Sequence, residues 1–593
     1  MKNDTTNEIT NEKIDAIKAK SLEIGVPIIT DETREVLAET LEKIKPLKIL
    51  EIGGGIGYSG AVILSSCTAH LTTIEIDADR FKLLKANLPN AKVIFGDALD
   101  EMQRLISVGE KFDFIFLDGA KAQYNNYFPF IDALLLPTGV LFADNIDFHG
   151  MASGELTPTK GAKTIIKGLQ NFKENLIKNA NYKTQYIKKG DGILIARKKV
   201  LGVELLAPAG NYARFKTALH FGADAVYMGG KQFGLRAGGD NFTESELKKA
   251  VNEAHKLGKK VYITVNIFAR NADFYDIKQY LINLDKIGVD AIIVSDLGVL
   301  RLAKQLTNLE VHISTQANVL NKYTAETYAN LGATRIVLAR ECSLAEIKEI
   351  CDYLKGRCEI EVFIQGAMCV SYSGRCLLSN YICSRESNRG MCAQPCRFSY
   401  TIKTADAEMP IEEDERGTYI LNSRDLCLAH YIGQLAEAGV KSFKIEGRNK
   451  SENYVAGAVG AYRRIMNGEI VDADAELSKI SHRPYTTGFA FNDDNKQFIE
   501  TAGATSTHDI VASILKTTQD IATVVHKNKF SVGDTLEILS PTEAHGKSFI
   551  VEKIINELGE QVDCAKKVKE VVKINCPFKL KKGDILIRAT EPK

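Results

Sequence analysis

Five cysteines fall within one short stretch of this 593-residue chain, EVFIQGAMCVSYSGRCLLSNYICSRESNRGMCAQPCRFSY, residues 361–400. They are Cys369, Cys376, Cys383, Cys392 and Cys396. Clustered thiols in a reducing cytosol indicate a metal or redox site, and thiolates select zinc or iron–sulfur clusters. If Cys383 is left out, the spacing is C-x6-C-x15-C-x3-C, which suits neither a zinc ribbon nor a zinc finger. We therefore expect a [4Fe–4S] cluster, with zinc and a reduced structural set of thiols as the alternatives, and Cys383 as a packed thiol.

A second group of side chains offers only oxygen. Asp118 ends the apolar run FDFIFLDGAK, and Asp144 with Asn145 ends GVLFADN. Carboxylate and amide oxygens are the ligands of a hard octahedral cation such as magnesium. Lys121 lies three residues beyond Asp118, so it is placed to act as a base on a hydroxyl that the metal has acidified. Ordinary turn formation by Asp and Asn is the alternative explanation.

The segment KILEIGGGIGYSG, residues 48–60, predicts a strand, a glycine-rich turn and the start of a helix. Glu75 ends the next apolar run, where its carboxylate can accept hydrogen bonds from two ribose hydroxyls. Such a carboxylate serves NAD and S-adenosylmethionine equally well. The oxygen-only set at Asp118, Asp144 and Asn145 favours S-adenosylmethionine together with a divalent cation.

Composition limits the class of protein. Lys and Arg number 76 and Asp and Glu number 75, so the net charge of the whole chain indicates neither a polyanion partner nor a membrane surface. The opening MKNDTTNEITNEKID is polar and lacks the apolar core of a signal peptide. No apolar run approaches the roughly 18 residues of a membrane span. We expect a cytoplasmic protein without a membrane partner, divided into several domains.

The first of these domains is expected over residues 1–200. Apolar runs that end in polar residues alternate there with helical spacers, which predicts a doubly wound, Rossmann-like parallel sheet whose ligand crevice lies at the carboxyl ends of the strands. The runs are 48–52, 71–77, 91–98, 112–118 and 139–145.

Eight further strand-like runs, most of them separated by helical segments, predict a (β/α)8 TIM-like barrel over residues 201–490. The runs are 204–209, 225–230, 261–266, 291–296, 311–316, 335–340, 361–366 and 442–447. The cysteine stretch directly follows the seventh run and so should lie over the barrel mouth. Short alternating strands over residues 505–593 predict a small C-terminal β-barrel.

Three polar residues at the predicted mouth are the best candidates for chemistry in the barrel. Arg236 lies in FGLRAGG, and Glu446 and Arg448 lie in KIEGRNK. Arginine suits the recognition of planar carboxylates and phosphates. A solvated loop position is the alternative for each of them taken singly.

The motifs EIGGGIGYSG, IEID, GDA, LDGAK and ADN resemble those of metal-dependent catechol-type O-methyltransferases, including the branch that methylates 5-hydroxyuridine in tRNA. The resemblance covers residues 10–200. It implies binding of S-adenosylmethionine by Gly53, Gly55, Glu75, Asp97, Ala98 and Asp118, with Asp97 and Ala98 flanking the adenine. It implies a Mg²⁺ or similar site at Asp118, Asp144 and Asn145, Lys121 as the base, and a homodimer through this domain.

The motifs LLAPAGN, GADAVYMGG, YITVN, STQANVLN, IQGAMCVSYSGRC, LNSRDL and KIEGR resemble the collagenase-like peptidase family. That family includes prephenate-dependent tRNA 5-hydroxyuridine synthases and relatives that hydroxylate ribosomal RNA or quinone precursors. The resemblance implies an iron–sulfur cluster on Cys369, Cys376, Cys392 and Cys396, and prephenate as the hydroxyl donor. Neither an HExxH motif nor a convincing Ser/His/Asp set supports peptidase chemistry.

Together the two resemblances imply consecutive steps on the anticodon loop of tRNA. The barrel would hydroxylate C5 of the wobble uridine, and the N-terminal domain would methylate the new oxygen to give 5-methoxyuridine. Hydroxylation and methylation of a small quinone or catechol is one alternative. A peptidase or a non-catalytic RNA-binding barrel fused to a methyltransferase is the other.

Overall fold

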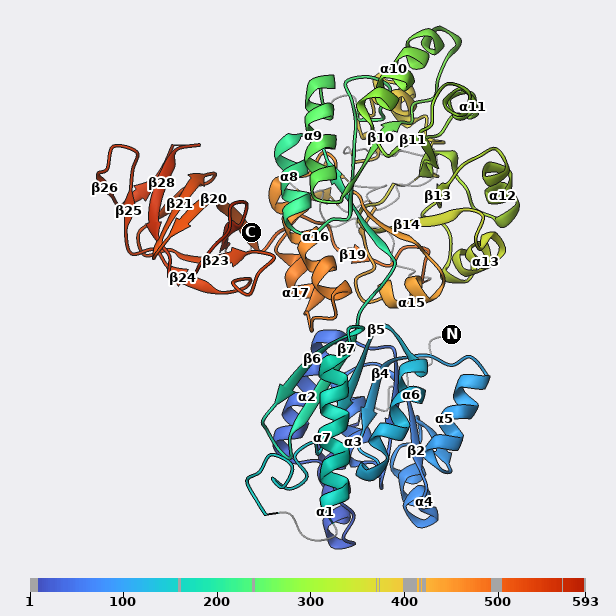
Figure 1. The fold of residues 1–593 in the computed structure, drawn as a ribbon, viewed down its shortest axis with the longest axis vertical. Coiled ribbons are helices and arrows are strands. Elements are labelled where there is room, and N and C mark those ends of the chain that lie inside the picture. Colours follow the sequence, from blue (N-terminus) through green and yellow to red (C-terminus); the bar gives the residue numbers. More distant parts are fainter. Residues whose placement is uncertain are drawn as a thin grey trace. The chain divides into compact units, whose positions relative to one another are not determined.

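The computed structural model divides into two compact units (Figure 1). The first comprises Met1–Leu201 with His430–Glu437 and Arg464–Ala473, and the second comprises the rest of the chain. The structure describes residues 9–157, 162–236, 240–369, 371–372, 374–397, 413–414, 417–418, 423–491, 504–567 and 569–590. The first eight residues and two residues of the LNSRDL motif lie outside this described part.

The first unit contains a seven-stranded sheet in the order β3-β2-β1-β4-β5-β7-β6. Strands β1 to β5 are parallel, and β7 pairs antiparallel with both β5 and β6. The strands are β1 (Lys48–Ile52), β2 (His70–Glu75), β3 (Lys92–Phe95), β4 (Phe112–Leu117), β5 (Leu135–Ala143), β6 (Tyr182–Ile187) and β7 (Ile193–Lys198). The predicted doubly wound, Rossmann-like sheet is confirmed.

Helices cover both faces of this sheet because its strands alternate between two cores. On β4, Phe114 and Phe116 belong to one core, and Ile115 and Leu117 belong to the other. The first core is closed by α1 (Asn11–Glu23), α2 (Asp31–Ile44), α3 (Tyr58–Ser66) and α4 (Ala78–Asn87). The second is closed by α5 (Ala98–Ser107), α6 (Tyr124–Leu134) and α7 (Lys163–Lys178).

The second unit contains eight parallel strands that close into a barrel, since β13 pairs with β14 as well as with β12. This confirms the predicted TIM-like barrel, and each predicted run overlaps one of its strands. They are β8 (Glu204–Ala209), β9 (Ala225–Met228), β10 (Lys260–Val265), β11 (Ala291–Val294), β12 (Glu310–Ile313), β13 (Arg335–Val337), β14 (Glu359–Ala367) and β18 (Ser442–Ile445). Two short strands, β17 (Asp425–Cys427) and β19 (Tyr485–Thr486), extend the sheet beside β14.

Each barrel strand is followed in the chain by a helix. These are α8 (Tyr212–His220), α9 (Glu244–Lys256), α10 (Phe274–Ile287), α11 (Leu297–Leu306), α12 (Lys322–Asn330), α13 (Leu344–Leu354), α15 (Ile432–Glu437) and α16 (Glu452–Met466). Helices α9 and α13 begin with capping boxes, in which Thr243 and Ser343 exchange hydrogen bonds with the glutamate three residues later. Between β14 and β17 the chain forms α14 (Leu378–Cys383), η4 (Ser387–Arg389) and η5 (Pro395–Arg397).

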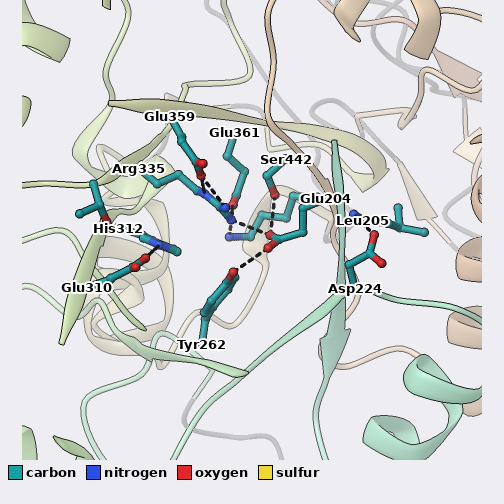
Figure 2. Close-up of polar contacts among 12 residues, drawn as sticks. Glu204, Leu205, Asp224, Tyr262, Glu310, His312, Arg335, Glu359, Glu361 and Ser442 are labelled. Carbon is teal, nitrogen blue, oxygen red and sulfur yellow. Dashed lines mark hydrogen bonds and ion pairs between the residues drawn. The ribbon is translucent and has the colours of Figure 1, made fainter. Parts of the chain in front are cut away.

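A network of paired charges fills the amino-terminal end of the barrel interior (Figure 2). Arg335 Nη1 lies 2.6 Å from Glu204 Oε1 and 3.3 Å from Glu361 Oε2. The other oxygen of Glu361 accepts a hydrogen bond of 2.7 Å from Lys444 Nζ. Tyr262 donates to the second oxygen of Glu204 at 2.6 Å. These buried charges are therefore each matched by an opposite charge, which is what makes them tolerable in the core.

The C-terminal part is all β, as predicted, and forms one eight-stranded sheet around a single apolar core. Its order is β24 (Ser548–Ile550), β23 (Thr535–Leu539), β29 (Ile585–Ala589), β20 (His508–Thr518), β21 (Ile521–His526), β28 (Val571–Asn575), β25 (Ile554–Ile555) and β26 (Gln561–Val562). A separate two-stranded ribbon of β22 (Phe530–Ser531) and β27 (Cys564–Ala565) contributes Phe530 and Ala565 to the same core. In the part of the chain that the structure describes, no helix is long and apolar enough to cross a bilayer.

Candidate functional site

The glycine-rich turn after β1 brings bare backbone to the carboxyl edge of the first sheet. Gly53 has a φ of +95°, and a Cβ added to it would lie 2.7 Å from the carbonyl oxygen of Asp118. A Cβ on Gly54 would lie 2.3 Å from Thr73 Oγ1. Only glycine fits these two positions without displacing backbone or a buried side chain. The N–H groups of Gly53 and Gly54 both donate to the carbonyl oxygen of Ile74 at 3.1 Å, so the turn is held against β2 and presents backbone without side chains just before α3.

Glu75 lies at the end of β2, where the sequence analysis expects it, and its carboxylate is buried against the turn. Its Oε2 accepts a hydrogen bond of 2.8 Å from the N–H of Gly55, and its Oε1 accepts one of 2.8 Å from the N–H of Asp77. An ionised carboxylate has further lone pairs, so Glu75 can still accept hydroxyl donors from a ligand. Asp97 instead caps α5 by accepting from the N–H of Leu99 at 2.9 Å, and Ala98 is the first residue of that helix.

Asp118, Asp144 and Asn145 follow the neighbouring strands β4 and β5. Asp144 is fully buried; its Oδ1 accepts from the Thr33 hydroxyl at 3.2 Å, and its Oδ2 has no partner in the described part of the chain. Burial and the nearby charge of Asp118 raise the pKa of Asp144 to about 7. A buried carboxylate oxygen without a donor is costly unless a cation neutralises it. The oxygen-only donors therefore fit a hard divalent cation, although the described residues contain no group of three or more His, Cys, Asp or Glu side chains arranged around one ion.

Lys121 and Asp118 form a direct ion pair, with Nζ 2.6 Å from Oδ1. Burial raises the pKa of Asp118, and the Lys121 ammonium opposes that shift. The pair holds the amine at the carboxyl edge of the sheet, next to the oxygen donors, where the sequence analysis places a base.

Three residues near this site were not identified from the sequence. The hydroxyl of Tyr124 donates to the backbone oxygens of Leu117 and Asp144, both at 3.1 Å, and so ties the ends of β4 and β5 together. Glu51 is buried beneath the glycine turn, where Ser59 donates to it at 2.5 Å. Asp191 accepts from the Asn145 amide at 3.3 Å. Glu51 had a sequence signal, since it is an acid in the middle of an apolar strand, whereas Tyr124 and Asp191 had none.

The four cysteines of the predicted cluster line one cavity of about 560 Å³ in the second unit. They are Cys369, Cys376, Cys392 and Cys396. Cys383 closes α14 and is not among the residues that line this cavity. Four thiols facing one space are the donor set of an iron–sulfur cluster, and in this respect the residues fit it. No three of the described cysteines, however, are placed around a single metal position.

The same cavity contains the predicted mouth residues Arg236 and Glu446, together with Arg340. Arg236 Nη2 lies 3.4 Å and Arg340 Nη2 lies 3.8 Å from the two carboxylate oxygens of Glu446. Burial opposes ionisation of Glu446, but the arginines outweigh it and lower its pKa. Arg340 also lies over the ring of Phe363, 4.1 Å from its centroid. Arg340 was not identified from the sequence, although it follows the sixth barrel strand.

Arg448 is buried deeper than the other mouth residues. Its Nη1 donates to Thr264 Oγ1 at 2.8 Å and its Nη2 donates to Asn241 Oδ1 at 2.7 Å. Its Nε has no partner in the described residues. Burial lowers the pKa of Arg448 to about 10. The structure thus brings Arg236, Glu446 and Arg448 together, as the sequence analysis predicts for one rim.

Other polar residues at strand ends have structural roles. Asn211 caps α8 by accepting from the N–H of Arg214 at 3.0 Å. Gln365 donates to the Tyr485 hydroxyl at 3.2 Å. His312 lies in the buried network of Figure 2, with its Nε2 3.7 Å from a carboxylate oxygen of Glu310, and it does not line the cavity of Cys369.

The chain thus joins two parts. The first is a doubly wound sheet with a candidate cofactor site at its carboxyl edge, and the second is a barrel with four cysteines at its mouth. Comparison with known families agrees with this division. Residues 16–199 match the family described as O-methyltransferase, residues 210–500 match peptidase family U32, and residues 506–587 match the peptidase family U32 C-terminal domain.

Among curated proteins, the chain is 38% identical over 396 residues to tRNA hydroxylation protein P1 of Bacillus subtilis, covering 64% of this chain and 92% of that protein. It is 35% identical over 415 residues to tRNA hydroxylation protein P of Escherichia coli, covering 61% of this chain and 91% of that protein. A solved structure of a putative caffeoyl-CoA O-methyltransferase from Staphylococcus aureus is 29% identical and covers 31% of this chain and 91% of that one, with a TM-score of 0.30. The chain belongs to peptidase family U32 and carries an additional N-terminal O-methyltransferase domain.

Proposed function

We propose that this protein modifies the wobble uridine of tRNA in two consecutive steps, 5-hydroxylation in the barrel and O-methylation in the N-terminal domain, with 5-methoxyuridine as the product. The observation that carries the proposal is the union in one chain of an O-methyltransferase domain and a region that matches almost the full length of tRNA hydroxylation proteins. A hydroxyl made by one domain is a natural acceptor for the other. The domains are taken as residues 1–200, 201–490 and 505–593.

In the methylation step, the Gly53 turn and Glu75 would bind S-adenosylmethionine, which supplies the methyl group. Asp118, Asp144 and Asn145 would hold Mg²⁺ or a similar cation, which would lower the pKa of the substrate hydroxyl. Lys121 would take up the hydroxyl proton as its amine. The methyl group would pass from the sulfonium to the substrate oxygen, with S-adenosylhomocysteine as the leaving product.

In the hydroxylation step, the C5–H bond of uridine is replaced by C5–OH, which is a two-electron oxidation. Oxygen and oxidising equivalents must come from a donor, and the family resemblance implies prephenate. Cys369, Cys376, Cys392 and Cys396 would hold a [4Fe–4S] cluster that supplies electron transfer beside the cavity. Arg236, Glu446 and Arg448 lie at the same mouth and would bind and orient the reactants.

The test is nucleoside mass spectrometry of tRNA from a bacterial strain that lacks its own uridine hydroxylases and methyltransferase and expresses this chain. We expect 5-methoxyuridine at the wobble position. If tRNA stays unmodified while a quinone or catechol becomes hydroxylated and methylated, the tRNA proposal is wrong. Sedimentation analysis of the purified chain tests the homodimer expected through the methyltransferase domain.

A further inference from the structure

A small pocket of about 70 Å³ lies inside the barrel next to the cysteine-lined cavity. Leu235, Arg236, Gln316, Arg340 and Glu446 line both spaces, so the pocket continues the cavity inward. One water molecule occupies roughly 30 Å³ in the liquid, so the pocket holds only a few heavy atoms. It has room for one functional group of a ligand whose body lies in the larger cavity.

The pocket carries an excess of positive charge. The charge of Lys444 is neutralised by Glu361, whose Oε1 lies 2.7 Å from Lys444 Nζ. Glu446 is the one carboxylate shared by Arg236 and Arg340. Arg448 has no carboxylate within ion-pair distance among the described residues. Among the described residues that line the inner pocket, three guanidinium groups and one carboxylate remain, an excess of two positive charges.

Arg448 is the strongest sign that this excess serves a ligand. Only 4% of the residue is exposed, its hydrogen-bond acceptors are neutral, and its Nε has no described partner. A buried charge without a counter-charge destabilises the folded state, and a buried hydrogen-bond donor without an acceptor adds to that cost. The surroundings are also shaped around it, since a Cβ on Gly229 would lie 2.4 Å from its Nη2. A bound anion would offset the cost of burying this guanidinium.

We propose that the inner pocket binds the carboxylate of a small organic dianion, with Arg448 and Arg340 as its principal donors, and that the rest of the ligand lies in the outer cavity beside the thiols. A planar carboxylate matches the guanidinium fork, and a dianion would neutralise the two excess charges. A phosphodiester of RNA is flanked by two sugars, which do not fit a space of about 70 Å³. This inference deepens the proposed function, because the site would seat the hydroxyl donor.

The experiment is isothermal titration of the full-length protein with prephenate, a dicarboxylate, and separately with its monocarboxylate counterpart phenylpyruvate and with inorganic phosphate. We expect prephenate to bind most tightly. A hydrogen bond to a charged group contributes about 1.5–3 kcal/mol, so Arg448→Gln and Arg340→Gln should each weaken prephenate roughly tenfold to a hundredfold. Arg301→Gln on α11 removes an exposed arginine that lines neither space, and it should leave binding unchanged.

Melting followed by circular dichroism shows whether each variant is folded. If Arg448→Gln does not fold, Arg340→Gln still tests the inference. Arg340 lies nearer the mouth, so its replacement should disturb the barrel core less. Unchanged prephenate affinity in a folded Arg340→Gln variant would overturn the inference, and so would phosphate binding as tightly as prephenate. Absence of carboxylate binding by a chain that still hydroxylates tRNA refutes this site alone. Carboxylate binding that requires Arg448 in a chain that leaves tRNA unmodified refutes the proposed function alone.

Discussion

Replacing Glu361 by glutamine tests whether the buried charges at the amino-terminal end of the barrel are as tightly matched as the structure shows. Glu361 is fully buried and accepts from both Lys444, at 2.7 Å, and Arg335, at 3.3 Å (Figure 2). Glu361→Gln keeps the shape but removes the one carboxylate within ion-pair distance of Lys444 in the described chain. The ammonium is then left in the core with its charge uncompensated.

The expected cost is about 3–5 kcal/mol, the usual penalty for removing one partner of a buried ion pair. At roughly 2 °C per kcal/mol for a domain of this size, the melting temperature of the barrel should fall by roughly 6–10 °C. Differential scanning calorimetry of the full chain measures it, and the melting transition of the methyltransferase unit serves as an internal reference. The shift should be largest near neutral pH. Lys444 and Arg335 lower the pKa of Glu361 against the effect of burial, so its stabilisation is present above the ordinary pKa and is lost as the pH falls through the lowered one.

A double-mutant cycle separates loss of the pair from loss of packing. Adding Lys444→Met to Glu361→Gln removes the stranded ammonium, so the double variant should melt above the Glu361→Gln single variant. The coupling should be about 1–3 kcal/mol. A Glu361→Gln variant that melts within about 2 °C of the wild type, or a double variant no more stable than the single one, would refute this account of the network.

Three further predictions concern the other sites. Burial raises the pKa of Glu51 from 4.5 to about 7, a cost of about 3 kcal/mol above that pH, so Glu51→Gln should raise the melting temperature of the methyltransferase unit at pH 8 and change it little at pH 5. Calorimetry at the two pH values checks this, and equal shifts would contradict it. Asp118→Ala or Lys121→Ala should make tRNA accumulate 5-hydroxyuridine in place of 5-methoxyuridine by mass spectrometry, and simultaneous loss of the hydroxylated nucleoside would argue against sequential domains. Cys369→Ser should bleach the brown colour expected of anaerobically purified protein while Cys383→Ser retains it, and colourless wild-type protein with one zinc per chain would exclude the cluster.

The fold could be predicted from the sequence because its signals are local. Apolar runs, their spacing and the polar residues that end them identify all five parallel strands of the first sheet and all eight of the barrel. The lengths of the strands were less well predicted. The run 335–340 was expected to be one strand, but β13 ends at Val337, and Arg340 lies beyond it at the mouth. A strand ends where its pairing with the neighbouring strands ends. For β13 these are β12 and β14, and the sequence of residues 335–340 alone does not show how far that pairing extends.

Site residues could be predicted only where the residue type alone indicates a possible metal ligand or catalytic group. Cys369 and Asp144 stand out in the sequence as possible ligands whatever surrounds them. Arg340 and Tyr124 do not, because their roles depend on partners brought together by folding, Glu446 for the first and the end of β5 for the second. Asp97 is the opposite case. The sequence suggested that it binds a ligand, whereas in the structure its carboxylate accepts a hydrogen bond from the first turn of the helix that it caps.

Comparison of the two ends of the barrel interior shows where the fold accepts instability. At the amino-terminal end, Arg335 and Lys444 are both matched by glutamates within hydrogen-bonding distance. At the mouth, Arg448 is just as buried, but its hydrogen-bond partners among the described residues are all neutral. Both charged sets belong to the same barrel, so a general tolerance of buried charge does not explain the difference. In TIM barrels, residues at the amino-terminal ends of the strands serve stability and residues at the carboxyl ends serve chemistry. The unmatched arginine lies at the carboxyl end, where a bound anion would supply the missing charge.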